Sequence, residues 1–256
     1  MSGVKSFVKD RVHWIVLDNP KRKNAMSEQM YNDICHAFDE ANESEETFIT
    51  VFTGGEGEYY SSGNDFSPSS MGANDQGDMD FESGYSKWMR RLIDHRKILI
   101  ALVNGPAIGI AATTLVLFDY VVASDSAYFV TPFPTIGVCP EGCSSQVFAR
   151  IMGTSKANEM LYFGEKMDAR RALETGFVAQ VYPKAQFKQE TDKLIEKYSK
   201  LPKHSVLASK EVCRGESWRR EMKSIHDHEY RTLKKLFSSE ETVNLILSRF
   251  APKNKM

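Results

Sequence analysis

The pattern of hydrophobic and polar positions divides the first part of the chain into strands and a helix. Residues 6–8 and 12–17 are β-rich runs joined by a charged triplet, which predicts a β-hairpin. A helix follows, because hydrophobic residues recur at helical spacing after Ser27, which can cap its first turn. The hydrophobic positions of this helix are Met30, Ile34, Ala37, Phe38 and Ala41. Residues 48–52 then predict a short strand.

The middle of the chain combines a long polar stretch with further apolar runs. From Gly54 to Gly84 the chain is rich in Gly, Ser, Asp and Asn, which bury too little apolar surface for a packed element and so predict a functional loop. Residues 88–93 then predict a helix, and the continuous apolar run 98–103 predicts a buried strand. The elements expected after it are an apolar helix at 109–117, strands at 120–123 and 127–130, and a turn-rich segment at 132–142.

The repeated order of strand, strand and helix indicates an α/β core, since each helix needs a sheet face to cover its apolar stripe. After about residue 190 the pattern is helical throughout, and one amphipathic segment carries Leu194, Ile195, Tyr198 and Leu201. We therefore expect two regions: a core at residues 1–195 that holds the active site, and a C-terminal helical region at residues 196–256.

Size and charge exclude several classes of protein. With 256 residues, of which 41% are apolar, the chain can bury the core of one catalytic domain. A formal net charge of -1 provides no broad basic field, so nucleic acid is not an expected partner. No window approaches the roughly 18 apolar residues of a membrane span, and the first ten residues lack a signal peptide, so we expect a soluble, intracellular protein.

The possible metal ligands do not form a recognisable site. The four cysteines are widely spaced without a Cys-x-x-Cys pair, which favours reduced thiols over a disulfide framework or a zinc site. His226-Asp227-His228 places its histidines two positions apart, on different sides of a helix, and this favours a solvated helix surface. We expect no bound metal.

Two glycine-bearing segments stand out because each lets the backbone approach a ligand closely: residues 61–66 (Ser-Ser-Gly-Asn-Asp-Phe) and 104–110 (Asn-Gly-Pro-Ala-Ile-Gly-Ile). The second segment opens a predicted helix. Its first N-H groups have no partner within the helix and can bind an oxygen that acquires negative charge. Because glycine turns are common, neither segment alone identifies a site.

Together with Pro140-Glu141-Gly142, the two segments resemble the crotonase (enoyl-CoA hydratase/isomerase) superfamily along nearly the whole chain. The resemblance implies a spiral of ββα units whose C-terminal helices mediate assembly into a homotrimer or a dimer of trimers. It implies a fatty acyl-CoA thioester as substrate, with coenzyme A as part of the substrate and no separate cofactor. It also implies that the backbone N-H groups of Asn64 and Ile110 form an oxyanion hole for the thioester carbonyl.

The same resemblance implies where acid and base should lie. Hydratases of the family place two glutamates around the substrate, at the positions of Thr113 and Phe133 here, and neither of these side chains can activate a water at neutral pH. Hydratase activity is therefore disfavoured. Glu141 instead stands where the family's peroxisomal-type delta(3),delta(2)-enoyl-CoA isomerases present one catalytic carboxylate. A Pro-Glu-Gly turn is also ordinary turn chemistry, so a solvated turn carboxylate is the alternative role.

The substrate should be bound by the glycine segments and by residues 21–23, a Lys-Arg-Lys triplet that corresponds to the family's contact with the coenzyme A nucleotide. Three solvated charges on a surface turn explain that triplet equally well. The residues assigned to substrate binding are Arg22, Lys23, Ser62, Gly63, Asp65, Phe66, Gly109 and Phe133. The segment from Phe66 to Gly84 is expected to shape the acyl tunnel.

The C-terminal Asn254-Lys255-Met256 resembles a degenerate Ser-Lys-Leu address, which suggests a peroxisomal location; a frayed basic tail in a cytoplasmic protein is the alternative. Because the catalytic pattern begins close to Met1, we expect no separate acyl-CoA-binding domain in front of it.

Two other functions stay open beside the isomerase. One is a different crotonase-type acyl-CoA enzyme, such as a dienoyl-CoA isomerase or a hydratase, which would need further acidic groups near the acyl chain. Asp65 and Asp119 are not obvious candidates for that role. The other is a non-catalytic acyl-CoA-binding or interaction module, against which the retention of Glu141 argues.

Overall fold

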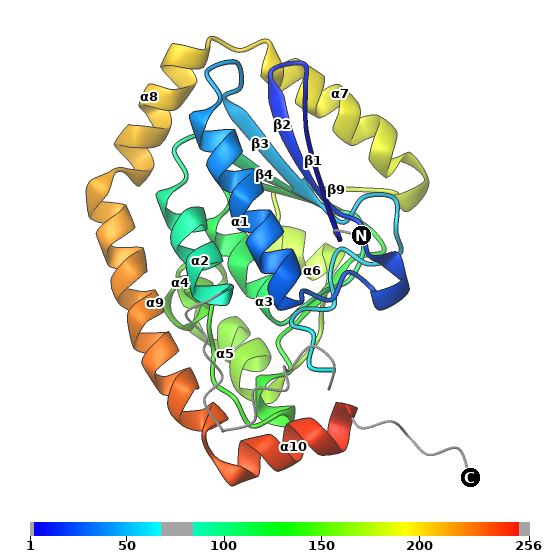
Figure 1. Ribbon diagram of the computed structural model, residues 1–256. Coiled ribbons are helices and arrows are strands. Elements are labelled where there is room, and N and C mark those ends of the chain that lie inside the picture. The colour runs from blue at the N-terminus through cyan, green and yellow to red at the C-terminus, as the bar shows by residue number, and fades with distance from the viewer. Residues whose placement is uncertain (1–2, 68–83, 251–256) are drawn as a thin grey trace.

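The computed structural model describes residues 3–67 and 84–250, and its main layer is a six-stranded sheet (Figure 1). The predicted hairpin is formed by β1 (Val4–Lys9) and β2 (Val12–Leu17), which pair antiparallel. The sheet continues through β3 (Ile49–Thr53), β4 (Ile98–Val103), β6 (Tyr120–Ser124) and β9 (Gln180–Tyr182), each parallel to the strand before it. Parallel neighbours require crossover connections, and these contain helices such as α1 (Glu28–Glu43) and α2 (Tyr85–Asp94).

The first helix begins where the sequence predicts. Ser27 accepts a hydrogen bond from the backbone N-H of Met30 through its hydroxyl oxygen, at 3.4 Å. All five hydrophobic positions predicted for one face of α1 are buried. The capping residue and the hydrophobic periodicity therefore suffice to predict where α1 begins and which of its faces is buried.

Both faces of the main sheet are covered. On one face, Phe52 and Leu99 belong to a core that includes residues of α1 and α2. On the other, Ile100 and Leu102 pack in a second cluster with Ile195 of α7 (Phe187–Ser199). Burial on both faces explains why β4 is a continuous apolar run. Leu201 differs from the prediction: it lies beyond the end of α7 and is 42% exposed.

A smaller sheet brings the two glycine segments together. It consists of β5 (Ala107–Ile108), β7 (Tyr128–Val130) and β8 (Met167–Asp168), with β5 parallel to β7 and β8 antiparallel to it. A bridge between Ser61 and Ala107 joins the loop after β3 to this sheet. Residues 61–66 and 104–110 therefore lie side by side although about forty positions separate them in the chain.

Several helices between residues 109 and 174 differ from the prediction or were not predicted. The helix expected at residues 109–117 is a single α-helical turn, α3 (Ile110–Thr113), followed by a 3-10 turn at Thr114–Leu117. The hydroxyl of Thr114 donates to the carbonyl of Ile110 at 2.7 Å, which competes with regular helix geometry. Three helices without a sequence prediction follow: α4 (Ser144–Met152), α5 (Thr154–Phe163) and α6 (Ala169–Glu174).

The C-terminal region is helical, as expected, and runs along the side of the core before it crosses beneath the sheets (Figure 1). It contains α8 (Lys203–Arg214), α9 (Glu216–Phe237) and α10 (Glu240–Phe250). Helix α9 packs against α2 and α4. The division placed at residue 195 falls inside α7.

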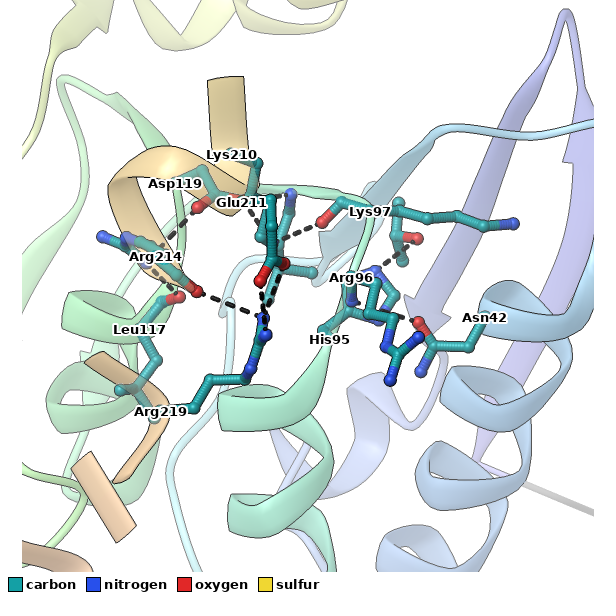
Figure 2. Close-up of polar contacts among 12 residues, drawn as sticks. Asn42, His95, Arg96, Lys97, Leu117, Asp119, Lys210, Glu211, Arg214 and Arg219 are labelled. Carbon is teal, nitrogen blue, oxygen red and sulfur yellow. Dashed lines mark hydrogen bonds and ion pairs between the residues drawn. The ribbon is translucent and has the colours of Figure 1, made fainter. Parts of the chain in front are cut away.

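Helix α8 is tied to the sheet by a buried ion pair (Figure 2). Lys210 Nζ lies 2.7 Å from Asp119 Oδ2, and both side chains are largely buried. Arg214 adds a hydrogen bond to the carbonyl of Leu117 at 2.7 Å, and Asp119 also accepts one from the backbone N-H of Leu99 at 2.8 Å. Asp119 is therefore a structural residue that holds α8 in place.

Replacing Asp119 by Asn should lower the free energy of unfolding by about 3 kcal/mol, because Lys210 would keep its charge without its buried partner. Urea-induced unfolding measures this. Asp192→Asn is the matched control, since it breaks an exposed pair with Lys188 and should cost less than about 1 kcal/mol. Equal losses in the two variants would contradict a stabilising role for the buried pair.

Candidate active site

A cavity of about 460 Å³ lies where the two glycine segments meet the segment that follows β7. All the site residues predicted from the sequence line it, with the exception of Lys23. Those lining residues are Arg22, Ser62, Gly63, Asn64, Asp65, Phe66, Gly109, Ile110, Phe133 and Glu141. The fold therefore gathers into one place residues that were selected on separate segments.

Close contact between the two glycine segments depends on Gly63. Its φ is +85°, and a Cβ atom there would lie 2.6 Å from the carbonyl oxygen of Ile108. The backbone N-H of Ile108 donates to the carbonyl of Ser61 at 3.0 Å, which fixes one segment against the other. Any side chain at position 63 would force the segments apart.

The two residues proposed to supply the oxyanion donors, Asn64 and Ile110, both line this cavity. Within residues 3–67 and 84–250, neither the N-H of Asn64 nor that of Ile110 donates a backbone hydrogen bond. Ile110 is the first residue of α3, so no helical carbonyl lies within its reach. Because α3 has only four residues, a helix dipole contributes little here. The N-H groups themselves are what the site offers to an oxyanion.

Glu141 is buried rather than solvated, since only 4% of its surface is exposed. Its Oε1 accepts a hydrogen bond of 2.8 Å from the hydroxyl of Thr113. Gly142 makes this approach possible, because a Cβ atom at that position would lie 2.5 Å from the Thr113 hydroxyl oxygen. The alternative of a solvated turn carboxylate is therefore wrong.

The surroundings of Glu141 favour its neutral form. Burial raises the pKa of Glu141 to about 8; hydrogen bonds from Thr113 and Tyr85 lower it, and the nearby carboxylate of Glu229 raises it. A carboxyl group whose pKa lies near neutrality can both accept and return a proton under physiological conditions. This is the property that a shuttle between two carbon atoms requires.

The rest of the cavity wall is largely apolar. Phe66 lies with its ring centroid 6.3 Å from that of Phe237 in α9 and 5.4 Å from that of Phe250 in α10. Phe133, at the second hydratase-glutamate position, is buried in the same wall. Asp65 is the other carboxylate among the described lining residues, and Arg22 holds it at 2.8 Å.

The model of the enoyl-CoA hydratase/isomerase family matches residues 8–256. The chain belongs to this family. Enoyl-CoA delta isomerase 2 of Rattus norvegicus is 41% identical over 244 residues, covering 94% of this chain and 62% of the rat protein. Peroxisomal enoyl-CoA delta isomerase 3 of Mus musculus is 45% identical over 210 residues, covering 80% of this chain and 65% of the mouse protein. The chain thus spans less than two thirds of the length of both relatives.

The family's fold is also found among solved structures. An enoyl-CoA hydratase/isomerase from Pseudoalteromonas atlantica superposes with a TM-score of 0.87 at 26% identity, covering 99% of this chain and all of that one. The predicted α/β class and crotonase-type spiral with helical C-terminus are therefore confirmed. Every helix in the described part of the chain is too short or too polar to cross a bilayer.

The basic residues at the cavity differ from the sequence prediction. Arg22 lines the cavity, whereas the ammonium group of Lys23 lies 4.8 Å from the ring centroid of Tyr59. Arg249 of α10 also lines the cavity and was not predicted from the sequence. No motif marks it, because it reaches the cavity through the packing of α10, which is far along the chain from the glycine segments.

His226 was expected on a solvated helix surface, and for this residue the expectation is wrong. It is fully buried, with its Nε2 3.3 Å from the hydroxyl of Ser86, and burial lowers its pKa to about 4. His228, two positions further on, is exposed as expected. Helix α9 packs against α2 and so buries the side that carries His226. No group of three metal-ligating side chains occurs within residues 3–67 and 84–250.

Proposed function

We propose that this protein is a delta(3),delta(2)-enoyl-CoA isomerase, which moves a double bond from C3 to C2 of an unsaturated fatty acyl-CoA during fatty acid β-oxidation. The observation that carries the proposal is the buried Glu141 carboxyl, in a largely apolar cavity that Asn64 and Ile110 also line. Within the described part of the chain, the N-H groups of these two residues donate no backbone hydrogen bond. The relatives named enoyl-CoA delta isomerase support the same reaction.

In this mechanism Glu141 works first as a base and then as an acid. Its carboxylate accepts a proton from C2, and the electrons of the broken C-H bond spread over the thioester as a dienolate. The N-H groups of Asn64 and Ile110 stabilise the charge on the thioester oxygen. Protonated Glu141 then returns the proton to C4, and the double bond comes to lie between C2 and C3.

Two further residues assist Glu141. Thr113 donates to Oε1, which holds the carboxyl group in one orientation and leaves Oε2 for the substrate. Tyr85 lines the same cavity and lowers the pKa of Glu141 through its hydroxyl. Neither residue has to gain or lose a proton for the reaction to proceed.

The substrate would lie across the cavity from its basic edge to its aromatic wall. Arg22 and Arg249 line the cavity and supply positive charge for the coenzyme A phosphates. Lys23, whose ammonium group lies against the Tyr59 ring, adds charge from outside the cavity lining. Ser62, Gly63 and Gly109 offer backbone contacts to the pantetheine arm, and the acyl chain packs against Phe66 and Phe133. Residues 68–83 of the segment expected to shape the acyl tunnel lie outside the described residues.

Assembly and location complete the proposal. We expect a homotrimer or a dimer of trimers, following the family resemblance, and size-exclusion chromatography with light scattering would determine this. A peroxisomal location is supported by the mouse relative, whose name includes that organelle. The C-terminal Asn254-Lys255-Met256 on which the targeting argument depends lies outside the described residues.

The protein should isomerise 3-enoyl-CoA at least about 10²-fold more efficiently than it hydrates 2-enoyl-CoA. Hydration must hold and deprotonate a water at C3 while a proton reaches C2, and Glu141 cannot perform both tasks with Thr113 and Phe133 at the glutamate positions. Steady-state kcat/KM values for both substrates under matched conditions measure the ratio. Comparable kcat/KM values for the two substrates would show that the protein is also a hydratase and contradict the single-base mechanism. Inactivity toward both substrates would indicate a non-catalytic module.

A further inference from the structure

A second buried carboxylate lies behind the turn that carries Glu141. Glu229, in α9, is 3% exposed and accepts two backbone hydrogen bonds. Its Oε2 accepts from the N-H of Cys143 at 2.8 Å and its Oε1 from the N-H of Ser145 at 3.0 Å. The two donors stand two and four positions after Glu141 in the chain. The carboxylate therefore connects a C-terminal helix to the turn that presents the proposed base.

This turn needs support from outside. Gly142 and Cys143 are consecutive residues with positive φ, +70° and +65°, and for Cys143 that conformation is unfavourable. Cys143 is also the N-cap residue of α4, and its side chain makes no capping hydrogen bond. Glu229 supplies the missing cap, because its charge suits both the unpaired N-H groups and the positive end of the helix.

We propose that Glu229 is a positioning residue for Glu141: its carboxylate clamps residues 141–145 so that the Glu141 side chain is held in the cavity beside Asn64 and Ile110. The proposal rests on the isomerase function proposed above. It assigns α9 a role in catalysis, since movement of this helix would move the base. Glu229 does not line the cavity and has no contact with substrate to make.

The clamp also has an electrostatic consequence. The charge of Glu229 raises the pKa of Glu141, and burial raises the pKa of Glu229 itself to about 7. The other titratable groups near the two carboxylates are Tyr31 of α1, Tyr85 of α2, Cys139 and Cys143 of the turn, and His226 of α9. The base is active when ionised, so kcat should rise with pH as the pair loses protons. Removing the charge at position 229 should move this rise to lower pH.

Glu229→Gln should reduce kcat for isomerisation by about 10- to 100-fold. The amide can accept a hydrogen bond from only one of the two N-H groups, so residues 141–145 and the Glu141 side chain are no longer held in position. KM should change little, since the residues proposed to bind substrate lie on other elements. The midpoint of the rise in kcat with pH should fall. Glu229→Asp keeps the charge with a shorter reach, so it should show an intermediate kcat with the midpoint of the wild-type protein.

Glu216→Gln is the matched control, since Glu216 is an exposed glutamate in the same helix, and it should leave kcat and midpoint unchanged. Wild-type kcat in Glu229→Gln would overturn the proposal. A loss of kcat without a shift of the midpoint would also overturn it, because a merely structural role predicts that pattern. If Glu229→Gln does not fold, Glu229→Asp decides through kcat and KM: a reduced kcat with wild-type KM and wild-type circular dichroism supports the clamp, and wild-type kcat, or a change in circular dichroism that accompanies the loss of kcat, overturns it.

A measurement that needs no turnover separates this proposal from the isomerase function. The pKa of Glu141 can be followed by NMR of ¹³C-labelled glutamate carboxyl groups, with Glu141→Gln to assign the signal. A lower pKa of Glu141 in Glu229→Gln supports the clamp whether or not the protein isomerises 3-enoyl-CoA. Failure of the wild-type protein to isomerise this substrate would contradict the proposed function alone. An unchanged pKa in a protein that does isomerise overturns the clamp alone.

Discussion

Replacing Glu141 by Gln should reduce kcat for isomerisation by at least about 10²-fold, the usual contribution of a positioned general base. The amide keeps the shape of the side chain and an oxygen that can accept the Thr113 hydrogen bond, but it cannot take the proton from C2. Binding of a saturated acyl-CoA should be nearly unchanged, because the residues proposed to bind it are untouched. Single-turnover kinetics and isothermal titration calorimetry measure the two effects separately.

The matched control is Glu165→Gln, which changes an exposed glutamate in the same way and should keep wild-type kcat. Circular dichroism and oligomer size must be unchanged in both variants. If Glu141→Gln retains more than about a tenth of wild-type kcat, another group is the proton carrier. Loss of acyl-CoA binding in the same variant would show instead that Glu141 shapes the cavity.

Local patterns predicted the elements whose signals are local. The β1–β2 hairpin follows from β-rich runs joined by a charged triplet, α1 from a Ser27 cap and helical periodicity, and β4 from a continuous apolar run. Each of these signals is contained within the segment itself. Helix α4 shows the opposite case. Its N-cap residue Cys143 provides no side-chain cap, and the group that does cap it comes from Glu229, which is 86 positions away. A helix whose start is stabilised at that distance leaves no local signal.

The residues of the candidate site also fall into two groups, those that a short motif marks and those that reach the site through packing. Glycines at 63 and 109, and the Pro-Glu-Gly turn, could be selected because such residues are recognisable in the sequence. Thr113 was interpreted only as a missing acid, whereas it is the hydrogen-bond donor to Glu141, 28 positions further along the chain. Tyr85, Glu229 and Arg249 reach the region through packing of α2, α9 and α10, which no short motif encodes.

Replacing Ile110 by Pro should reduce kcat by about 10² to 10³-fold, since proline deletes the backbone N-H that is proposed to stabilise the dienolate. The position suits this test. Ile110 is the first residue of α3, where proline is well tolerated. The preceding residue is Gly109, with φ +58° and ψ -126°. Only glycine adopts this extended backbone conformation with positive φ readily, and it is not the helical conformation that a following proline disfavours.

Ile110→Val is the matched control, because valine, like proline, has three side-chain carbon atoms and it keeps the N-H. It should lose less than about 10-fold in kcat, the cost of a small gap beside a buried side chain. The decisive quantity is the ratio of kcat between the two variants, compared at equal oligomer size and equal circular dichroism. Binding of a saturated acyl-CoA should be similar in both, because its carbonyl carries much less negative charge than the dienolate. Equal kcat values for Pro and Val would mean that the Ile110 N-H does not stabilise the reaction, and the oxyanion would then depend on the N-H of Asn64 without this second donor.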